Sequence, residues 1–353
     1  MQWNATEGVF LRRRTCPYTR PLVQHVDDDR PRVSVIIPVK DRRALLCETL
    51  DALDAQTVAD FEVIVVDDGS SDGSGAAAAA RTVRGRPVVV VDGRGRGAVH
   101  ARLRGVEVAR GDVLAFTDSD CVPAPRWLEA ALAAFDTGAD LVNGRTAPAR
   151  QPLPLERTMG SGLEGLYPTC NVLYRRAAYD AAGGFDHGAG DRWGFRVDQR
   201  TRGDGFGEDT LLAWRVIRAG GRAVHVPEAL VEHAVFPPDD LADMLSRTAR
   251  VAAFPAMVRE VPELRRTLLV DRWQLGARSR VPVYGLFAAL ALRRPRLAFV
   301  FLVAWVVLRV QELRAFPVSW RRRIAVLPVE MSVDVVMAVA LAVGSARARS
   351  ITL

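Results

Sequence analysis

Cysteine is scarce in this sequence, and the spacing of the few that occur excludes two kinds of small scaffold. The four cysteines, Cys16, Cys47, Cys121 and Cys170, lie far apart and form no CxxC pair. Structural zinc sites and disulfide frameworks need closer or repeated spacings. We therefore expect reduced thiols and a cytoplasmic protein.

Lysine is nearly absent, since Lys40 is the only one. The net charge is nevertheless +7, so arginine supplies almost all of the positive charge. This excess favours an anionic partner such as a nucleotide phosphate, a lipid phosphate or a membrane surface. The sequence carries no helix-turn-helix, zinc-finger or RNA-binding signature, so we expect no nucleic acid among its partners.

A long uncharged apolar run is missing as well. Residues 1–14 contain no apolar segment typical of a secretory signal. Near the C-terminus, three charge-free stretches each fall short of the roughly 20 apolar residues of a membrane-crossing helix. They are Val281–Leu292, Leu297–Leu308 and Val335–Ala346. We interpret them as buried or interfacial helices and not as membrane-crossing helices. If the protein associates with the cell membrane, we expect it to be peripheral on the cytoplasmic face.

The sequence does contain a regular alternation of short apolar runs and amphipathic stretches. The apolar runs predict strands at Val33–Pro38, Phe61–Val66, Val88–Val91 and Val113–Thr117. Helices are expected between them, at Ala44–Ala55, Ser74–Val83 and His100–Ala109. This order predicts an α/β fold with a mostly parallel sheet and helices on both faces.

The second half of the chain continues the alternation less regularly. Further strands are expected at 140–144 and 170–174, with short edge strands at 223–225 and 229–233. Helices are expected from Arg126, at 176–182 and at 210–219, and loops at 145–168 and 186–207. We divide the chain into an irregular lead-in (1–31), a catalytic domain (32–236) and a helical, arginine-rich tail (237–353). The domain has a nucleotide half (32–122) and an acceptor half (123–236).

Carboxylates gather where the predicted parallel strands end, which is the edge at which open α/β sheets bind ligands. Asp118-Ser119-Asp120 directly follows a strand, and two carboxylates at i and i+2 on extended backbone point the same way. They can address one hard divalent cation, which prefers oxygen ligands. Asp27-Asp28-Asp29 has the same spacing without a preceding strand, and a solvated turn is the alternative for both.

Two turns near this edge have further interpretations. Asp67-Asp68-Gly69-Ser70 predicts a tight turn, and a carboxylate there can also accept a hydrogen bond from a base. Gly93–Ala98 matches GxGxxA, which raises a dinucleotide-binding alternative. That fingerprint belongs after the first strand of its unit, whereas this one follows the third. A flexible loop that lets backbone and Arg102 approach a phosphate is the other interpretation.

A pair of acids opens a predicted helix further along the chain. Glu208 and Asp209 are either capping residues at the helix N-terminus or include a general base that takes a proton from an acceptor hydroxyl. The preceding loop carries Trp193 and Phe206, which could shape an acceptor pocket. His233 is a single histidine on a short apolar segment, a pattern more typical of a structural residue than of a metal ligand.

Taken in order, five segments resemble the family 2 glycosyltransferases over roughly residues 32–235. They read VSVIIPVKDR, VVDDGSSDGS, HARLRGVEVARGDVLAFTDSDC, CNVLYRRAAYDAAGGFD and GEDTLLAWRVIRAGGRAVHVPEALVEH. The resemblance implies a GT-A (Rossmann-like) fold, a nucleoside-diphosphate sugar donor, and inverting single displacement assisted by Mg²⁺ or Mn²⁺. The acceptor would be a saccharide, a lipid-linked saccharide or a small molecule.

The resemblance also implies roles for residues of the nucleotide half. Pro38 and its neighbours Lys40 and Asp41 would line the base pocket, and Asp68 would contact the base. Arg102 would lie near base or phosphate. Lys40-Asp41 departs from a frequent Tyr-Asn, and Leu103 from a frequent Asn, which leaves the base contacts open.

Metal and acceptor roles follow from the same resemblance. Asp118 would contact ribose or metal, Asp120 would bind the metal, and His233 would complete its shell or touch the diphosphate. Asp209, after Glu208, is the expected base. Asn171 belongs to the acceptor-side motif, with Trp193 as a further acceptor-side residue. Cys121 stands where an acid is common.

Three alternatives remain open. A nucleotidyltransferase that makes a sugar nucleotide would release pyrophosphate. A dinucleotide-dependent oxidoreductase would use the glycine loop, and a non-catalytic scaffold would bind membrane or another enzyme. Only the glycosyltransferase uses all five segments, so it is the reading that we favour.

Overall fold

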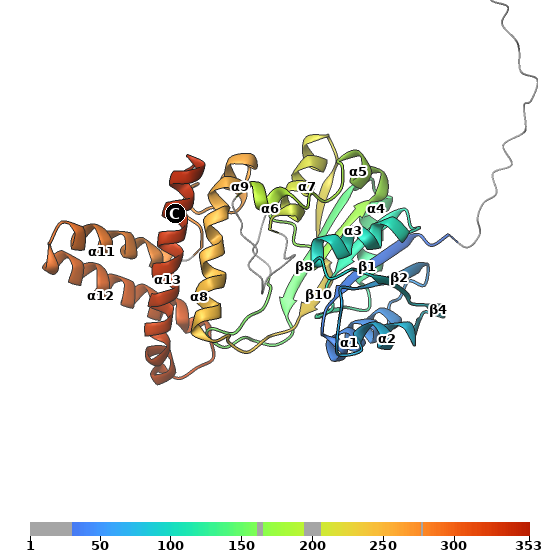
Figure 1. Ribbon diagram of the computed structural model, residues 1–353, viewed down its shortest axis with the longest axis horizontal. Coiled ribbons are helices and arrows are strands. Elements are labelled where there is room, and N and C mark those ends of the chain that lie inside the picture. Colours follow the sequence, from blue (N-terminus) through green and yellow to red (C-terminus); the bar gives the residue numbers. More distant parts are fainter. Residues whose placement is uncertain (1–29, 161–164, 194–205, 277) are drawn as a thin grey trace, which may run out of the picture. The chain divides into compact units, whose positions relative to one another are not determined.

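The computed structural model describes residues 30–160, 165–193, 206–276 and 278–353 (Figure 1). The lead-in expected over residues 1–31, with Asp27–Asp29, therefore lies almost wholly outside the described residues. Part of the loop expected at 186–207 also lies outside them. Residues Pro31–Leu353 form one compact unit.

One half of the central sheet is parallel, as the apolar runs predict. It contains β1 (Val33–Val39), β2 (Phe61–Asp67), β5 (Val89–Asp92) and β6 (Val113–Thr117). Strand β1 lies between β2 and β6, and β5 pairs with the outer side of β2. Every residue of β1 is buried, which explains its continuous apolar run.

The other half of the sheet is mixed. It contains β9 (Asn171–Arg175), β8 (Leu141–Pro148), β10 (Ala223–His233) and β7 (Cys121–Pro123). Strand β9 is antiparallel to both β6 and β8, β10 is parallel to β8, and β7 is antiparallel to β10 at the end of the sheet. The full order is β5-β2-β1-β6-β9-β8-β10-β7. Since only β7 and β9 reverse direction, the sheet is mostly parallel.

The prediction of two short edge strands at 223–225 and 229–233 is wrong. They form a single strand, β10, which lies between β8 and β7 and not at an edge. Its pairing with β8 shifts between Val226 and Leu230. Pro227 lies in this irregularity, and because proline has no N–H to donate, the ladder is interrupted there.

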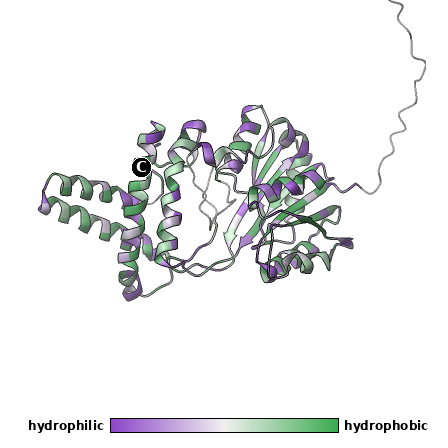
Figure 2. Ribbon diagram, viewed as in Figure 1, coloured by the Kyte–Doolittle hydropathy of each residue, from purple (hydrophilic) through white to green (hydrophobic). Residues whose placement is uncertain are grey.

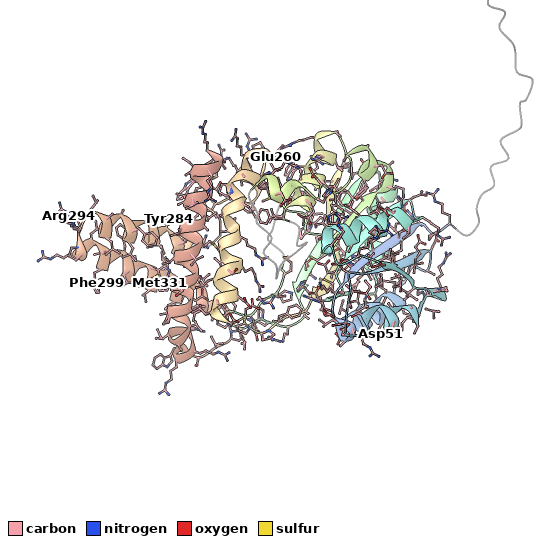
Figure 3. The ribbon with its side chains drawn as sticks, in the orientation of Figure 1. Asp51, Glu260, Tyr284, Arg294, Phe299 and Met331 are labelled. Carbon is pink, nitrogen blue, oxygen red and sulfur yellow. The ribbon has the colours of Figure 1, made fainter. Side chains whose placement is uncertain are left out.

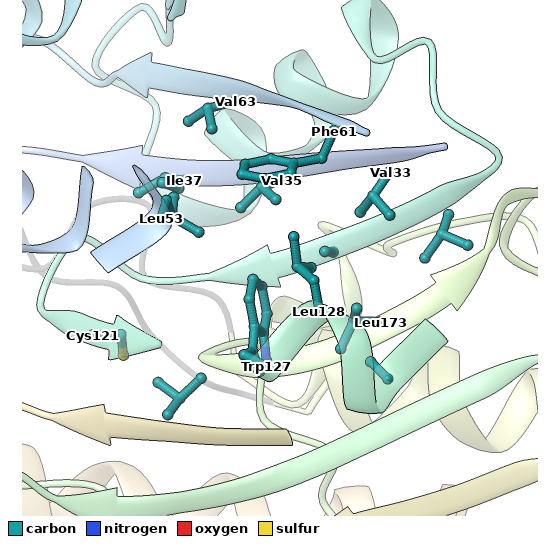
Figure 4. Close-up of a cluster of buried hydrophobic side chains, with 14 of the residues drawn as sticks. Val33, Val35, Ile37, Leu53, Phe61, Val63, Cys121, Trp127, Leu128 and Leu173 are labelled. Carbon is teal, nitrogen blue, oxygen red and sulfur yellow. The ribbon is translucent and has the colours of Figure 1, made fainter. Parts of the chain in front are cut away.

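Helices cover both faces of the sheet (Figure 1). They are α1 (Arg43–Asp54), α2 (Ser74–Ala79), α3 (Ala98–Val108), α4 (Trp127–Asp136), α5 (Arg176–Ala181), α6 (Ala189–Arg192) and α7 (Glu208–Arg218). Val35 and Ile37 pack with helices α1 and α4 on one face, where Leu53 and Trp127 join them (Figure 4). Ile36 points to the opposite face and packs with α3, α5 and α7. This alternation produces the two apolar layers of the core.

The helix expected over Ser74–Val83 is shorter than predicted. It ends at Ala79, and a small hairpin of β3 (Thr82–Val83) and β4 (Arg86–Pro87) follows. Thr82 and Val83 are β-branched and favour extended backbone. Gly85, with φ of 77°, supplies the turn.

The chain is helical from residue 241 onward, as expected. The helices are α8 (Leu241–Ala249), α9 (Phe254–Glu260), α10 (Leu264–Thr267), α11 (Val281–Ala291), α12 (Pro295–Glu312) and α13 (Trp320–Ala348), with 3₁₀ turns at Arg250–Ala253, Arg278–Arg280 and Leu313–Ala315. Apolar residues colour long parts of α11, α12 and α13 (Figure 2).

Helix α13 is longer than the charge-free stretch from which it was predicted. With 29 residues it is the one described helix that is long and apolar enough to cross a membrane by length and composition, and 22% of its most apolar window is buried. Asp334 in this helix is buried and forms ion pairs with Arg280 and Arg309. It also accepts a hydrogen bond from Trp305 at 2.9 Å. These contacts fasten the 3₁₀ turn before α11 and helix α12 to the middle of α13.

Candidate active site

Asp120 and His233 come together through the pairing of two strands. The turn Asp118-Ser119-Asp120 connects β6 to β7, and β7 pairs with the end of β10 so that Cys121 faces His233. The His233 Nε2 atom lies 3.7 Å from Asp120 Oδ1. One ligand atom from each of Asp120, Cys121 and His233 lies within 4.8 Å of the others, which is a geometry that could hold a metal ion.

The ring of His233 is oriented for ligation. Its Nδ1 atom lies 2.8 Å from the carbonyl oxygen of Ala234, which can only accept a hydrogen bond. Nδ1 therefore carries a proton, and Nε2 is the ring nitrogen on the side of Asp120, where it could ligate an ion. Such a backbone contact is the usual way in which a protein fixes a metal-binding histidine.

Cys121 is the weakest ligand of the three. Its hydrogen bond with Cys170 and its burial raise the pKa of the thiol well above the ordinary value. A thiol must lose its proton to bind a metal well, and Mg²⁺ and Mn²⁺ prefer oxygen ligands. Asp120 and His233 therefore fit a hard divalent cation better than Cys121 does. Figure 4 shows Cys121 at the border of the apolar cluster.

Arg42 also reaches this group, although no motif of the sequence singled it out. Its Nη1 atom forms an ion pair with Asp120 Oδ2, and its guanidinium lies 4.9 Å from the ring centroid of Phe236. Arg42 follows β1 at the carboxyl edge of the sheet, so its position in the chain was the available signal. The Asp120 side chain is only 8% exposed, so this cation offsets an otherwise buried charge.

Asp118 is bonded to a second arginine, Arg102. It accepts a hydrogen bond from Arg102 Nη2 at 2.7 Å, and Arg102 Nη1 lies 3.8 Å from Glu208 Oε1. Burial alone would lower the pKa of Arg102, but the charges of Asp118 and Glu208 outweigh it and the pKa is raised. Asp118 thus lies outside the Asp120–Cys121–His233 group, yet only Ser119 separates it from Asp120. These contacts connect the end of β6 to the start of α7.

Gly207 positions the two acids that begin α7. Its φ is 70°, and a Cβ at this position would lie 2.6 Å from Met257 Sδ and 2.7 Å from the Trp193 ring. Glycine therefore permits both the left-handed turn and the close packing. The following residues, Glu208 and Asp209, enter the site with their backbone in the first turn of the helix.

Both acids hold their protons more tightly than usual. Burial and the charge of Asp209 raise the pKa of Glu208 to about 7, although Arg102 opposes the shift. Burial also raises the pKa of Asp209 to about 6, while hydrogen bonds from Thr210 oppose it. The Asp209 Oδ1 atom accepts from Thr210 N at 2.7 Å. A carboxylate with a pKa near neutrality suits general base catalysis.

Asp68 and Asp41 organise the loops of the predicted base pocket. The buried Asp68 carboxylate accepts hydrogen bonds from the backbone N–H groups of Arg96 and Gly97, at 2.9 and 2.7 Å. Asp41 Oδ1 accepts from Ser71 N at 2.6 Å. Pro38 and Lys40 lie in the same region, Pro38 buried in β1 and Lys40 exposed just beyond it.

The two residues expected on the acceptor side are both buried. Asn171 is fully buried: its Oδ1 accepts from Trp127, and its Nδ2 donates to the carbonyl groups of Arg145 and Ala229. This geometry favours a structural role, joining β9 to β8 and β10, over the acceptor contact that the sequence suggests. Trp193 donates to Glu260 at 2.6 Å.

Trp193 also borders an open cavity of about 600 Å³ between α6, α9 and α13. The cavity is further lined by Arg192, Arg259, Glu260 and Arg347. A cavity with three arginines at its walls therefore lies beside Trp193, the residue predicted on the acceptor side.

Residues 34–184 match the family model described as glycosyl transferase family 2. Glycosyltransferase AglE of Haloferax volcanii is 38% identical over 118 residues, which cover 32% of this chain and 39% of that protein. The pre-mycofactocin glycosyltransferase of Mycobacterium tuberculosis is 29% identical over 224 residues, covering 57% and 42%. The chain thus spans less than half the length of these relatives.

Among solved structures, the chain resembles the mannosyltransferase PcManGT from Pyrobaculum calidifontis, determined in complex with GDP-Man and Mn²⁺. The TM-score is 0.52 at 20% identity, and the match covers 91% of this chain and 87% of that one. At this identity the likeness concerns the fold.

The sheet order and this likeness show a GT-A fold. Within that fold, residues 34–184 form a domain that matches glycosyl transferase family 2. The α/β fold and the family expected from the five segments are therefore confirmed.

Proposed function

We propose that the protein transfers a sugar from a nucleoside-diphosphate sugar to an acceptor hydroxyl, with inversion at the anomeric carbon and with Mg²⁺ or Mn²⁺ bound. One observation supports this most directly. The Asp120–His233 pair and the Asp118–Arg102–Glu208 network are adjacent at the carboxyl edge of a GT-A sheet. This arrangement combines ligands for a dication with a cation for a phosphate.

Asp120 and His233 would hold the ion, with Asp118 as a further carboxylate once it leaves Arg102. When bound, such an ion offsets the negative charge of a diphosphate leaving group. In the proposal, Asp68, Pro38, Lys40 and Asp41 shape the space for the base. Arg102 then lies beside the phosphates.

Asp209 is the proposed base. Its carboxylate takes the proton of the acceptor hydroxyl while the hydroxyl oxygen forms a bond to C1 of the donor sugar. The bond between C1 and the diphosphate oxygen breaks, and the electron pair leaves with the nucleoside diphosphate. Glu208, beside Arg102, would keep that guanidinium in place.

The acceptor is proposed to approach from the side of Trp193, where the cavity lies. A saccharide, a lipid-linked saccharide or a small molecule would each present a hydroxyl there. The arginines at the cavity wall favour an acceptor that carries negative charge.

The glycine loop weighs against the oxidoreductase alternative. In a dinucleotide site, backbone N–H groups of the loop bind the pyrophosphate. Here the N–H groups of Arg96 and Gly97 donate to Asp68 instead. They would have to be released before a cofactor phosphate could bind.

The test is a panel of nucleotide sugars, screened by thermal shift with and without Mn²⁺ and then for turnover. We expect at least one donor to raise the melting temperature only with the metal and to release nucleoside diphosphate. Release of pyrophosphate from a nucleoside triphosphate would instead favour a nucleotidyltransferase. Stabilisation by a nicotinamide dinucleotide would favour the oxidoreductase, and intact donor after long incubation would favour a scaffold.

We also propose a location for the reaction, at the cytoplasmic face of an anionic membrane. The support is the arginine cluster Arg293, Arg294 and Arg296 together with the exposed apolar side chains beyond residue 280.

A further inference from the structure

Helices α11 and α12 form a hairpin whose outer surface is apolar. Seven large apolar side chains on it are between 44% and 70% exposed: Leu290, Leu292, Leu297, Phe299, Val300, Val303 and Val307. In Figure 3, Arg294 lies at the turn of the hairpin and Phe299 on its outer side. Exposed apolar surface of this kind marks an interaction site in a folded protein.

The hairpin is ordered by its own packing and by its base. At Gly285 of α11 a Cβ would lie 2.5 Å from the Phe301 ring, so the absence of a side chain lets α12 approach closely. Val283, Trp305 and Ala338 form a small core where the hairpin meets α13. The ion pairs of Asp334 with Arg280 and Arg309 secure the same junction.

The exposed apolar positions go most of the way around α12. At 100° per residue, Leu297, Phe299, Val300 and Leu302 point in four widely spaced directions. The buried residues Ala298 and Trp305 share the remaining direction. A partner protein, including a second copy of this chain, would cover one stripe of the helix. A lipid phase can cover all of the exposed directions at once.

Apart from Glu312, the last residue of α12, the charges of the hairpin have one sign. Residues 281–311 contain four arginines and no acidic residue, and three of the arginines, Arg293, Arg294 and Arg296, cluster at the turn. All three are exposed. This distribution complements an anionic lipid surface.

We infer that the α11–α12 hairpin is a membrane-docking element that lies in the plane of an anionic leaflet. Moving one arginine to the middle of a bilayer lowers insertion by a factor of roughly 100. The three arginines at the turn therefore exclude an insertion in which the tip of the hairpin enters the bilayer first. The charge-free part of α12, Leu297–Leu308, is about 18 Å long as a helix, short of the ~30 Å apolar thickness. In the plane, α12 lies below the headgroups so that acyl chains surround its exposed apolar directions, while the arginines at the turn reach the phosphates.

This inference rests on the proposed membrane location and not on the transfer reaction. The test uses the full chain and vesicles of phosphatidylcholine with 30 mol% phosphatidylglycerol (about one lipid in three) or without it, in ~50 mM or ~500 mM NaCl. We expect sedimentation with the anionic vesicles at low salt and release at high salt. Absence of binding at low salt would overturn the inference, and retention that only detergent reverses would overturn the in-plane geometry.

Two variants and a matched control locate the contact. The outer-surface variant Phe299→Ser/Val300→Ser/Val303→Ser should weaken binding on the order of 100-fold, because apolar area no longer enters the leaflet. The turn variant Arg293→Gln/Arg294→Gln/Arg296→Gln should lose roughly 5-fold per arginine on anionic vesicles only. The control Val108→Ser/Leu241→Ser removes apolar side chains that are 40% and 48% exposed elsewhere, and it should bind as the wild type does.

Two further measurements separate the remaining outcomes. Melting temperature and metal-dependent donor binding should be the same in all variants, which shows that the domain is intact whether or not it docks. Light scattering should report the same molar mass for wild type and outer-surface variant. A wild-type dimer that the outer-surface substitutions dissociate would assign the surface to a second copy of the chain and overturn the lipid assignment.

Discussion

Arg42 forms an ion pair with Asp120, on the opposite carboxylate oxygen from the one that lies 3.7 Å from His233 Nε2. A guanidinium thus binds the carboxylate that the proposed metal also needs. The two cations would compete for Asp120, and the same Arg42 guanidinium also lies 4.9 Å from the Phe236 ring centroid.

Removal of this competitor should strengthen metal binding. We expect Arg42→Ala to bind Mn²⁺ about two- to fivefold more tightly in the absence of donor, the range of a partly exposed ion pair. Titration followed by Mn²⁺ electron paramagnetic resonance would measure it. Arg43→Ala is the matched control, because Arg43 begins α1 one residue further on and forms no described contact with Asp120. Weaker binding in Arg42→Ala would mean that the arginine helps to assemble the site.

His233 should contribute to metal affinity, whereas its neighbour on the same strand should not. We expect His233→Asn to weaken Mn²⁺ binding by at least about tenfold, since a ligand of the ion is lost. His225→Asn, on the exposed part of β10, should leave the affinity unchanged. Calorimetric titration of both variants would decide. Equal affinities for His233→Asn and the wild type would remove His233 from the ligand set.

Asp209→Asn should abolish most turnover while leaving donor binding intact. Loss of a general base typically costs 10²–10⁴-fold in rate, and the amide keeps the size of the side chain. Turnover and the donor dissociation constant would be measured for the same preparation. Asp180→Asn, exposed at α5, serves as control. Ordinary turnover in Asp209→Asn, with loss in Glu208→Gln, would transfer the role of base to Glu208.

The rate should fall in acid. Because the pKa of Asp209 is raised to about 6, protonation removes the base as the pH drops through that value. We expect kcat/KM to decrease tenfold per pH unit well below about pH 6. A profile that is flat down to about pH 5 would contradict an assignment of Asp209 as the base.

Glu208 should make folding stability depend on pH in the opposite sense to an ordinary surface acid. Its folded-state pKa of about 7 exceeds the ordinary 4.5, so the protonated form is favoured in the folded protein. That contribution is full below about pH 4.5 and is lost as the pH rises to about 7, at a cost of up to ~3 kcal/mol. Glu208→Gln should therefore melt higher than the wild type at pH ~8 but not at pH ~5. The exposed Glu232→Gln should show no such difference.

Much of the nucleotide half could be predicted, because it is built from local patterns. The apolar run of β6 followed by Asp118-Ser119-Asp120 is contiguous in sequence, and the parallel order places Asp68 at the same edge. The position of His233 could not be predicted in this way. It depends on the pairing of β10 with β7, two strands far apart in the chain, and no local periodicity records that register.

The sequence also could not show which polar side chains are buried and already hydrogen-bonded within the fold. From the sequence, Asn171 and Asp68 are polar residues available to a ligand. In the fold, the amide of Asn171 is bonded on three sides, and the Asp68 carboxylate closes the glycine loop. Which polar groups face inward depends on tertiary packing, because the backbone groups that they satisfy come from other strands and loops.

The interruption at Pro227 has a consequence for how this site could change between relatives. Beyond it, the ladder resumes at Leu230 and delivers His233 opposite Cys121. If the ladder positions were kept, a chain longer by one residue at the interruption would place Glu232 there, and a chain shorter by one would place Ala234. A single insertion or deletion at this interruption could thus exchange the imidazole of the proposed ion site for a carboxylate or remove that side chain from the site altogether.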